Sequence, residues 1–234
     1  MILTSIDVDI NMTDNKGSTP LHCASRNGNI RAVQQLFTHP LIDINRKDDE
    51  GCTPLHIASE EGNIEVMKFL LSHPEIHINE LDNHDSTPLH LASEKSGDDA
   101  IEVLLSHPDI DLNILNKSFA TALHLLAERN NIISISKLIN QHSIDVNKAG
   151  HQGQTPLHFA ASNGSYESIE ELLSSELINI WAKDHRKNTP IFCSVMANNI
   201  ESTVLFMKCE GFDVNYKNIK GVFLLYIRQF FIIV

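Results

Sequence analysis

Apolar residues recur along the chain with helical spacing, in segments of about eight residues. The first segment holds Ile30, Val33, Leu36 and Phe37. The same spacing returns 34 residues later in Ile64, Met67, Leu70 and Leu71, and again in Ile101, Leu104 and Leu105. Positions three and four apart share one face of an α-helix, so each segment predicts a short amphipathic helix. A His-Pro pair follows each of these segments, and proline ends the helix there.

A tetrapeptide, Thr-Pro-Leu-His, precedes each amphipathic segment and predicts another short helix. It begins at Thr19, Thr53, Thr87 and Thr155, with variants Thr-Ala-Leu-His at Thr121 and Thr-Pro-Ile-Phe at Thr189. Each copy begins 34 residues after the last. Threonine is a favoured N-cap, and proline suits the first helical position because its missing N–H would have no helical partner there. Glycine follows several of these helices and permits the left-handed conformation of a tight reversal.

A third motif, Ile-Asp-Ile-Asn and its variants, keeps the same period and begins at Ile42, Ile76, Ile110, Ile144 and Phe212. Motifs fixed to one period make a chance origin implausible. One such unit buries too few aliphatic side chains to offset the entropy of ordering it. We therefore expect the stacked array to be the folding unit.

These units closely resemble the ankyrin repeat, in the Gly-x-Thr-Pro-Leu-His-x-Ala turn, the two short helices and the Ile-Asp-Ile-Asn exit. The tetratricopeptide repeat has the same period, but its Trp and Tyr pattern is missing here. The resemblance implies an all-α solenoid of stacked helix-turn-helix units with β-hairpin or loop fingers. The histidine of the tetrapeptide is then expected to bond the Thr of its motif and nearby backbone, and the exit asparagine to bond the hairpin backbone. Hydroxylation of that asparagine, known in some ankyrin proteins, is an alternative.

We expect one repeat array over residues 1–234. Residues 1–13 end a preceding repeat and 218–234 begin a seventh, with an atypical apolar tail. The six full repeats are predicted at 14–47, 48–81, 82–115, 116–149, 150–183 and 184–217.

Three repeats depart from the pattern at the turn glycine. Gly17, Gly51 and Gly153 align with Asp85, Phe119 and Lys187 in the others. Phenylalanine and lysine adopt positive φ poorly, so we expect altered hairpins in the fourth and sixth repeats. The sixth repeat also has Phe192 in place of the histidine, and we expect it to be looser.

A net charge of -12 opposes binding to nucleic acid or to an anionic membrane. The four cysteines form no Cys-x-x-Cys pair, and residues 1–11 lack the basic residues of a signal peptide, so we expect a cytoplasmic protein with free thiols. The apolar segment 222–234 is shorter than the roughly 20 residues of a membrane span. It could be a capping helix, an interfacial anchor or, as we favour, a truncated continuation of the array.

Thirteen histidines raise the question of a metal site. The five in the tetrapeptide lie one repeat apart, about 10 Å, whereas zinc needs nitrogens within about 2.1 Å. No nucleophile elbow, P-loop or zincin motif is present. We therefore predict no metal, no cofactor, no small-molecule substrate and no enzymatic activity.

Ankyrin proteins engage partners with the hairpin tips and the inner face of the first helix. In the second repeat these positions hold Asp49, Glu50, Glu60 and Glu61, and in the third they hold His84, Asp85, Glu94 and Lys95. We expect this acidic patch to bind a basic segment of a protein partner, with Phe119 as an apolar anchor beside it. Solvated surface charge without a partner is the simpler alternative.

The predicted function is therefore that of a monomeric scaffold or adaptor. Two alternatives stay open. The chain could be the substrate-targeting part of a larger enzyme or channel, such as a kinase or ubiquitin ligase, or a membrane-associated adaptor that uses residues 222–234.

Overall fold

The computed structural model describes residues 9–95 and 97–221. Their contacts divide the chain into two units, residues 1–117 and 118–234, and each unit is described by itself. Both units consist of α-helices and loops, which confirms the predicted all-α class. Residues 1–8 of the expected end of a preceding repeat, 1–13, and the apolar segment 222–234 lie outside the described residues.

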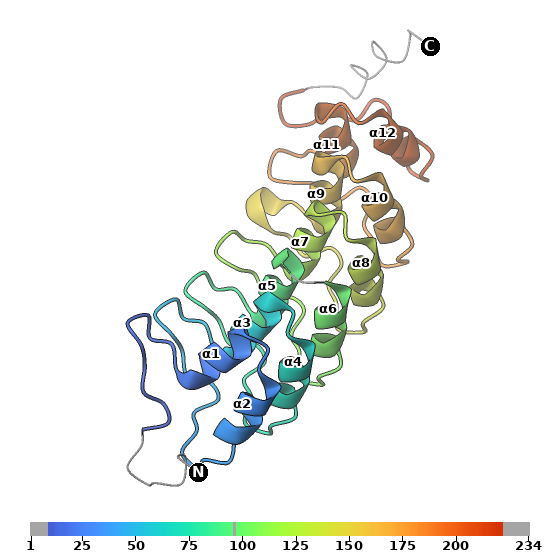
Figure 1. Ribbon diagram of the computed structural model, residues 1–234. Coiled ribbons are helices and arrows are strands. Elements are labelled where there is room, and N and C mark those ends of the chain that lie inside the picture. The colour runs from blue at the N-terminus through green and yellow to red at the C-terminus, as the bar shows by residue number, and fades with distance from the viewer. Residues whose placement is uncertain (1–8, 96, 222–234) are drawn as a thin grey trace. The chain divides into compact units, whose positions relative to one another are not determined.

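Three helix pairs make up the first unit. Its helices are α1 (Pro20–Arg26), α2 (Ile30–Leu36), α3 (Pro54–Glu61), α4 (Ile64–Leu71), α5 (Pro88–Lys95) and α6 (Asp98–Leu105). The first helices of the pairs, α1, α3 and α5, pack side by side in one layer, and α2, α4 and α6 pack in a second layer. The loops between pairs extend beyond the first layer as fingers (Figure 1).

The second unit repeats this arrangement. Its helices are α7 (Ala122–Glu128), α8 (Ile132–Ile139), α9 (Pro156–Asn163), α10 (Tyr166–Leu173), α11 (Pro190–Met196) and α12 (Ile200–Met207), with a 3₁₀ helix, η1 (His151–Gly153). One helix pair falls inside each of the six predicted repeats. The single array over both units stays a prediction.

The tetrapeptide histidines have the bonds that the resemblance implies. The Nδ1 atom of His56 accepts from the backbone N–H of Thr53 at 3.1 Å, and the Thr53 hydroxyl lies 2.9 Å from the same nitrogen. On the other side of the ring, Nε2 lies 3.0 Å from the Ser86 carbonyl of the next repeat. Because Nδ1 accepts a backbone N–H, the proton belongs on Nε2, which donates to that carbonyl. Each ring thus joins its own helix cap to the following repeat.

The same pair of contacts recurs at His22, His124 and His158, whose Nε2 atoms reach the carbonyls of Cys52, Gln154 and Asn188. Burial lowers the pKa of His22, His56 and His158 below the ordinary value of 6.5. These rings are therefore neutral at physiological pH, in keeping with the bonds that they form.

Backbone hydrogen bonds join each finger to the next, an arrangement that we call the finger ladder. In the first unit the N–H groups of Asp49, Asn83 and Lys117 donate to the carbonyls of Lys16, Glu50 and His84, at 3.0, 3.0 and 2.9 Å. In the second unit those of His151, His185 and Ile219 donate to Phe119, Gln152 and Arg186, at 3.0, 2.9 and 3.0 Å. The ladder holds neighbouring finger tips at a set spacing within each unit.

The exit asparagines add a second set of links between repeats. They bond backbone groups as expected, but those of the segment after the second helix of the next repeat and not those of the hairpin. The Asn45 side chain donates to the Glu75 carbonyl at 2.7 Å and accepts from the His77 N–H at 3.0 Å. In the fifth repeat Trp181 takes the place of asparagine, and its indole N–H donates to the Glu210 carbonyl at 2.9 Å. The indole therefore supplies the same donor as the amide that it replaces.

The expectation of an altered sixth hairpin is wrong. Lys187 takes the left-handed conformation with φ +56°, as Gly51 does with φ +77°. The N–H of Lys187 donates to Asp184 O at 2.9 Å, the same bond that Gly51 makes to Asp48 O. The capping aspartate holds the loop in this shape, because Asp184 Oδ1 accepts from the N–H groups of Arg186 and Asn188.

Phe119 in the fourth repeat also takes the left-handed conformation, with φ +56°. Its carbonyl accepts the ladder bond from His151, one residue after the acceptor position of the other fingers, which aligns with Ser118. The fifth finger differs too, since η1 forms there and Gln152 has φ +54°. Here Gly150 stands where four other repeats have the capping aspartate and the fourth repeat has Asn116. A Cβ at Gly150 would lie 2.4 Å from the Phe119 carbonyl oxygen, so the close approach requires glycine.

In the sixth repeat an aromatic contact takes the place of the missing histidine. Phe192 is buried, and its ring meets the ring of Tyr216 edge to face at 5.9 Å between centroids. The Tyr216 hydroxyl donates to the Lys187 carbonyl at 3.0 Å. Phe192 and Tyr216 together link this repeat to the following finger.

The left-handed lysine gives a direct test of this loop geometry. Left-handed backbone costs a non-glycine residue about 1 kcal/mol or more, and the Lys187 side chain is exposed. Lys187→Gly is therefore expected to raise the free energy of unfolding by about 0.5–1 kcal/mol, measured by urea unfolding.

The matched control for Lys187→Gly is Gly51→Ala, which should destabilise. Its new Cβ would lie 2.7 Å from the backbone nitrogen of Asn83, and φ stays positive. A loss of stability in Lys187→Gly would show that the lysine is not strained.

Candidate protein-binding surface

The binding residues predicted at the second and third repeats lie on two fingers and two helices of the first unit. Asp49, Glu50, His84 and Asp85 occupy finger tips, and Glu60, Glu61, Glu94 and Lys95 occupy the last turns of α3 and α5. Asp49, Glu50, Glu61, His84 and Lys95 are exposed, and Glu60, Asp85 and Glu94 are half-buried. We call these eight residues the finger surface.

The finger surface has a fixed backbone. Asn83 donates its backbone N–H to the Glu50 carbonyl at 3.0 Å and its side-chain amide to the Asp49 carbonyl at 2.8 Å. Its neighbour Asp82 accepts from the N–H groups of His84 and Ser86 at 2.7 and 2.8 Å. Rigid tips lose little conformational freedom on binding, which favours affinity for a partner of matching shape.

One ion pair within the finger surface could not be expected from either residue alone. The Lys95 ammonium of α5 bonds the Glu60 carboxylate of α3, and this bond raises the pKa of Lys95. The pair neutralises one of the predicted acidic side chains. Its only trace in the sequence is a pair of opposite charges 35 residues apart, one more than the repeat.

A second ion pair lies beside the fingers. The Lys47 ammonium contacts the Glu80 carboxylate at 2.7 Å and also donates to the Leu81 carbonyl at 2.8 Å. The hydrogen bond from Lys47 lowers the pKa of Glu80. This pair joins the second finger to the third and adds no net charge.

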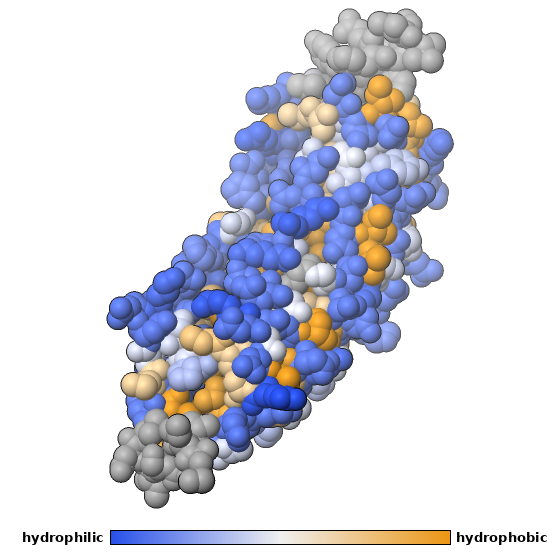
Figure 2. Space-filling view, viewed as in Figure 1, coloured by the Kyte–Doolittle hydropathy of each residue, from blue (hydrophilic) through white to orange (hydrophobic). Residues whose placement is uncertain are grey.

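The acidic excess of the chain belongs entirely to the first unit. Residues 1–117 hold 20 acidic and 8 basic residues, a difference of -12, whereas residues 118–234 hold 10 of each. Hydrophilic residues cover most of the face drawn in Figure 2, and hydrophobic residues lie in separate patches. The finger surface therefore belongs to a strongly acidic unit.

Phe119, the predicted apolar anchor, belongs to the second unit. Its side chain is 57% exposed, and its ring centroid lies 6.4 Å from that of His151. Its place beside the acidic residues stays a prediction, because the two units are described separately.

Two buried thiols of the described segments are poor nucleophiles. Burial raises the pKa of the Cys52 thiol to about 12 and that of Cys193 to about 11, which disfavours the reactive thiolate. Within residues 9–95 and 97–221, no three histidine, cysteine or acidic side chains are grouped as metal ligands.

A family model described as ankyrin repeats in three copies matches residues 1–82, 41–116, 89–184 and 123–218. The chain belongs to the ankyrin-repeat family. Ankyrin repeats are protein-interaction modules and form a non-catalytic family. The resemblance read from the tetrapeptide and the exit motif is thus confirmed.

A solved ankyrin structure shows the same fold. The crystal structure of the ankyrin repeat domain of Bcl-3, a member of the IkappaB protein family, matches with a TM-score of 0.81 and 25% sequence identity. The match covers 90% of this ankyrin chain and 94% of the Bcl-3 chain. A search of curated proteins found no match. No helix in the described part of this ankyrin protein has the length and apolar character needed to cross a bilayer.

Proposed function

We propose that this ankyrin protein is a monomeric cytoplasmic scaffold or adaptor that binds a basic segment of a protein partner through the finger surface, without catalysis of its own. The observation that carries the proposal is the group of exposed acidic side chains on the second finger and the last turn of α3, on fingers joined by backbone hydrogen bonds. This group presents negative charge on a rigid support.

The ion pair narrows the set of residues that would bind. Because Glu60 already contacts Lys95, the partner would meet chiefly Asp49, Glu50 and Glu61, which are exposed. Electrostatic complementarity of this kind speeds association and makes it depend on salt. The net charge of the first unit would draw a basic segment toward this surface before contact.

A pair of double variants tests the proposal. Glu50→Lys with Glu61→Lys reverses two exposed charges of the finger surface and leaves the Glu60–Lys95 pair in place. Glu170→Lys with Glu176→Lys makes the same change in net charge at exposed positions of the second unit. Each is compared with the unsubstituted chain by affinity capture from cytosol and mass spectrometry, followed by titration of the purified partner.

We expect the finger-surface variant to bind at least tenfold more weakly, with a shallower dependence of affinity on salt, while the control variant binds normally. Equal affinity and equal salt dependence for all three proteins would reject the finger surface as the binding site.

A further inference from the structure

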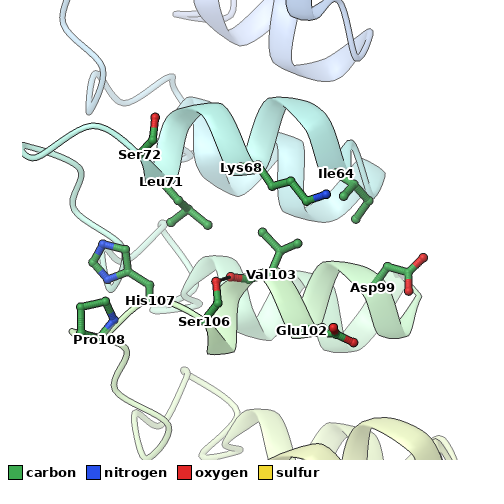
Figure 3. Close-up of a pocket in the computed structure, with 10 residues that line it drawn as sticks. All are labelled: Ile64, Lys68, Leu71, Ser72, Asp99, Glu102, Val103, Ser106, His107 and Pro108. Carbon is green, nitrogen blue, oxygen red and sulfur yellow. Dashed lines mark hydrogen bonds between the residues drawn. The ribbon is translucent and has the colours of Figure 1, made fainter.

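The second layer of the first unit, formed by α2, α4 and α6, contains a groove of about 680 Å³ between α4 and α6. Leu71 and Val103 extend toward each other across it, from α4 and α6 (Figure 3). His107 and Pro108 border one end, and Asp99 lies toward the other. The groove lies on the second helices of the repeats and shares no residue with the finger surface.

Aromatic side chains fill the equivalent position between the preceding two helices of this layer, α2 and α4. Between α2 and α4, the ring of Phe37 packs edge to face against Phe69 at 5.0 Å and against His73 at 5.6 Å between centroids. Thirty-four residues later, the same three positions hold Leu71, Val103 and His107. Two aromatic rings are thus replaced by smaller aliphatic side chains.

This substitution accounts for the hollow at the His107 end. The histidine that contacts an aromatic ring in the preceding pair is kept, but the ring itself is missing. Leu71, Val103 and Pro108 give this end apolar walls, with Ser72 and Ser106 at its edges. Such walls fit a flat aromatic group, whose edge-to-face contact with a histidine already occurs one repeat earlier.

The opposite end of the groove is acidic. Asp99 and Glu102 of α6 line it, and Asp98 lies beside Asp99 in the first turn. The cation in the lining is Lys68, which contacts Glu65 of its own helix at 3.3 Å. Carboxylates therefore outnumber cations at this end, and a positively charged group is the complementary ligand.

We propose that the groove binds a protein segment that carries an aromatic residue and, two positions away, a basic residue. The ring would fill the space between Leu71, Val103 and His107, and the cation would meet Asp99 and Glu102. Asp99 and Val103 are four residues apart on α6, about 6 Å along its axis. Alternate side chains of an extended peptide lie on one face at about the same separation.

This groove is a second interaction site, on another layer of the unit, and its occupation does not require the finger surface. The partner segment could belong to the protein held at the fingers or to a different one. Both cases share the same chemistry at the groove.

The probe for the test is the peptide acetyl-Trp-Gly-Arg-amide, added to the full chain and followed by ¹H–¹⁵N NMR. We expect saturable shifts confined to residues of α4, α6 and the loop after α6. Acetyl-Ala-Gly-Arg-amide, which lacks the ring, and acetyl-Trp-Gly-Glu-amide, which lacks the cation, should each bind at least fivefold more weakly.

Val103→Phe tests the groove by filling it, since the equivalent position of the preceding repeat holds Phe69. The variant should keep its thermal unfolding midpoint or raise it, and should lose the peptide-induced shifts. Asp99→Lys changes an exposed residue and gives a second variant that leaves the packing intact. It should prefer the Trp-Gly-Glu peptide over the Trp-Gly-Arg peptide.

Glu61→Lys is the control that separates the two proposals, because it alters the finger surface and should leave peptide binding at the groove unchanged. Absence of shifts, shifts elsewhere in the chain, or undiminished binding by both Val103→Phe and Asp99→Lys would overturn the inference. The finger-surface proposal would stand in each of those cases.

Discussion

Leu55→Ala is expected to lower the free energy of unfolding by about 3–4 kcal/mol, since removing a fully buried leucine side chain leaves a cavity. Leu55 is 0% exposed. It lies on α3, which packs against both α1 and α5, so the cavity weakens two interfaces between repeats. In a stacked array each repeat is stabilised by its neighbours, and damage to a middle repeat spreads to both sides.

The measurement is urea unfolding followed by circular dichroism, which reports helices of both units. The matched control is Leu41→Ala, the same substitution at a leucine that is 70% exposed in the same unit. Its effect should stay within about 0.5 kcal/mol. A loss below about 1 kcal/mol for Leu55→Ala would mean that the stacked layers contribute little to stability.

Acidification from pH 7 to pH 5 is expected to destabilise the protein through its buried histidines. Burial lowers the pKa of His22, His56 and His158 in the folded state below 6.5. Below pH 6.5 the unfolded chain therefore binds protons that the folded chain does not. Stability is fully present above that pH and falls as the pH approaches the folded values.

The size of the effect follows from the number of histidines. Each contributes at most about 1.4 kcal/mol per pH unit, so three give a slope of up to about 4 kcal/mol per pH unit. Burial disfavours the charged ring, and the Nδ1 atom, which accepts a backbone N–H, would also lose that bond on protonation. Protonation at Nδ1 therefore breaks the cap bond within the repeat, whereas the Nε2–H bond to the next repeat remains.

Urea unfolding at pH 7.5, 6.5, 5.75 and 5.0 measures this slope. Hydrogen bonds lower the pKa of Asp14 and Glu80, so their contributions are lost only below about pH 4.5 and do not overlap. Imidazole ¹⁵N shifts give an independent check, since they distinguish the neutral Nε2–H form from the cation. Equal unfolding midpoints at pH 7.5 and 5.0 would contradict the prediction.

Local chemistry made the helices predictable from the sequence. Thr53 and Pro54 define the start of α3, and Gly62 ends it in the left-handed conformation with φ +68°. These signals act within a few residues of one another, so a single repeat is enough to recognise them. The period of 34 residues then extends the assignment to the other helix pairs.

Features that depend on contacts between repeats were out of reach of the sequence. The Glu60–Lys95 pair, the indole bond of Trp181 and the groove beside Val103 each need side-chain geometry across two repeats. The hairpin error had a similar origin. The turns were predicted from their glycines alone. In the sixth finger, however, Asp184 holds the loop around Lys187 in its conformation, and the fifth finger, which has Gly150 at the position of that aspartate, differs.

The finger ladder also bears on how new recognition could arise in such a protein. The bonds of the ladder involve only main-chain atoms, so the exposed side chains at the tips do not enter them, provided that glycines such as Gly51 and Gly150 are kept. Substitution there alters charge and shape while the separation between contact points persists. Evolution can therefore change the specificity of the surface one residue at a time, with the underlying architecture conserved throughout.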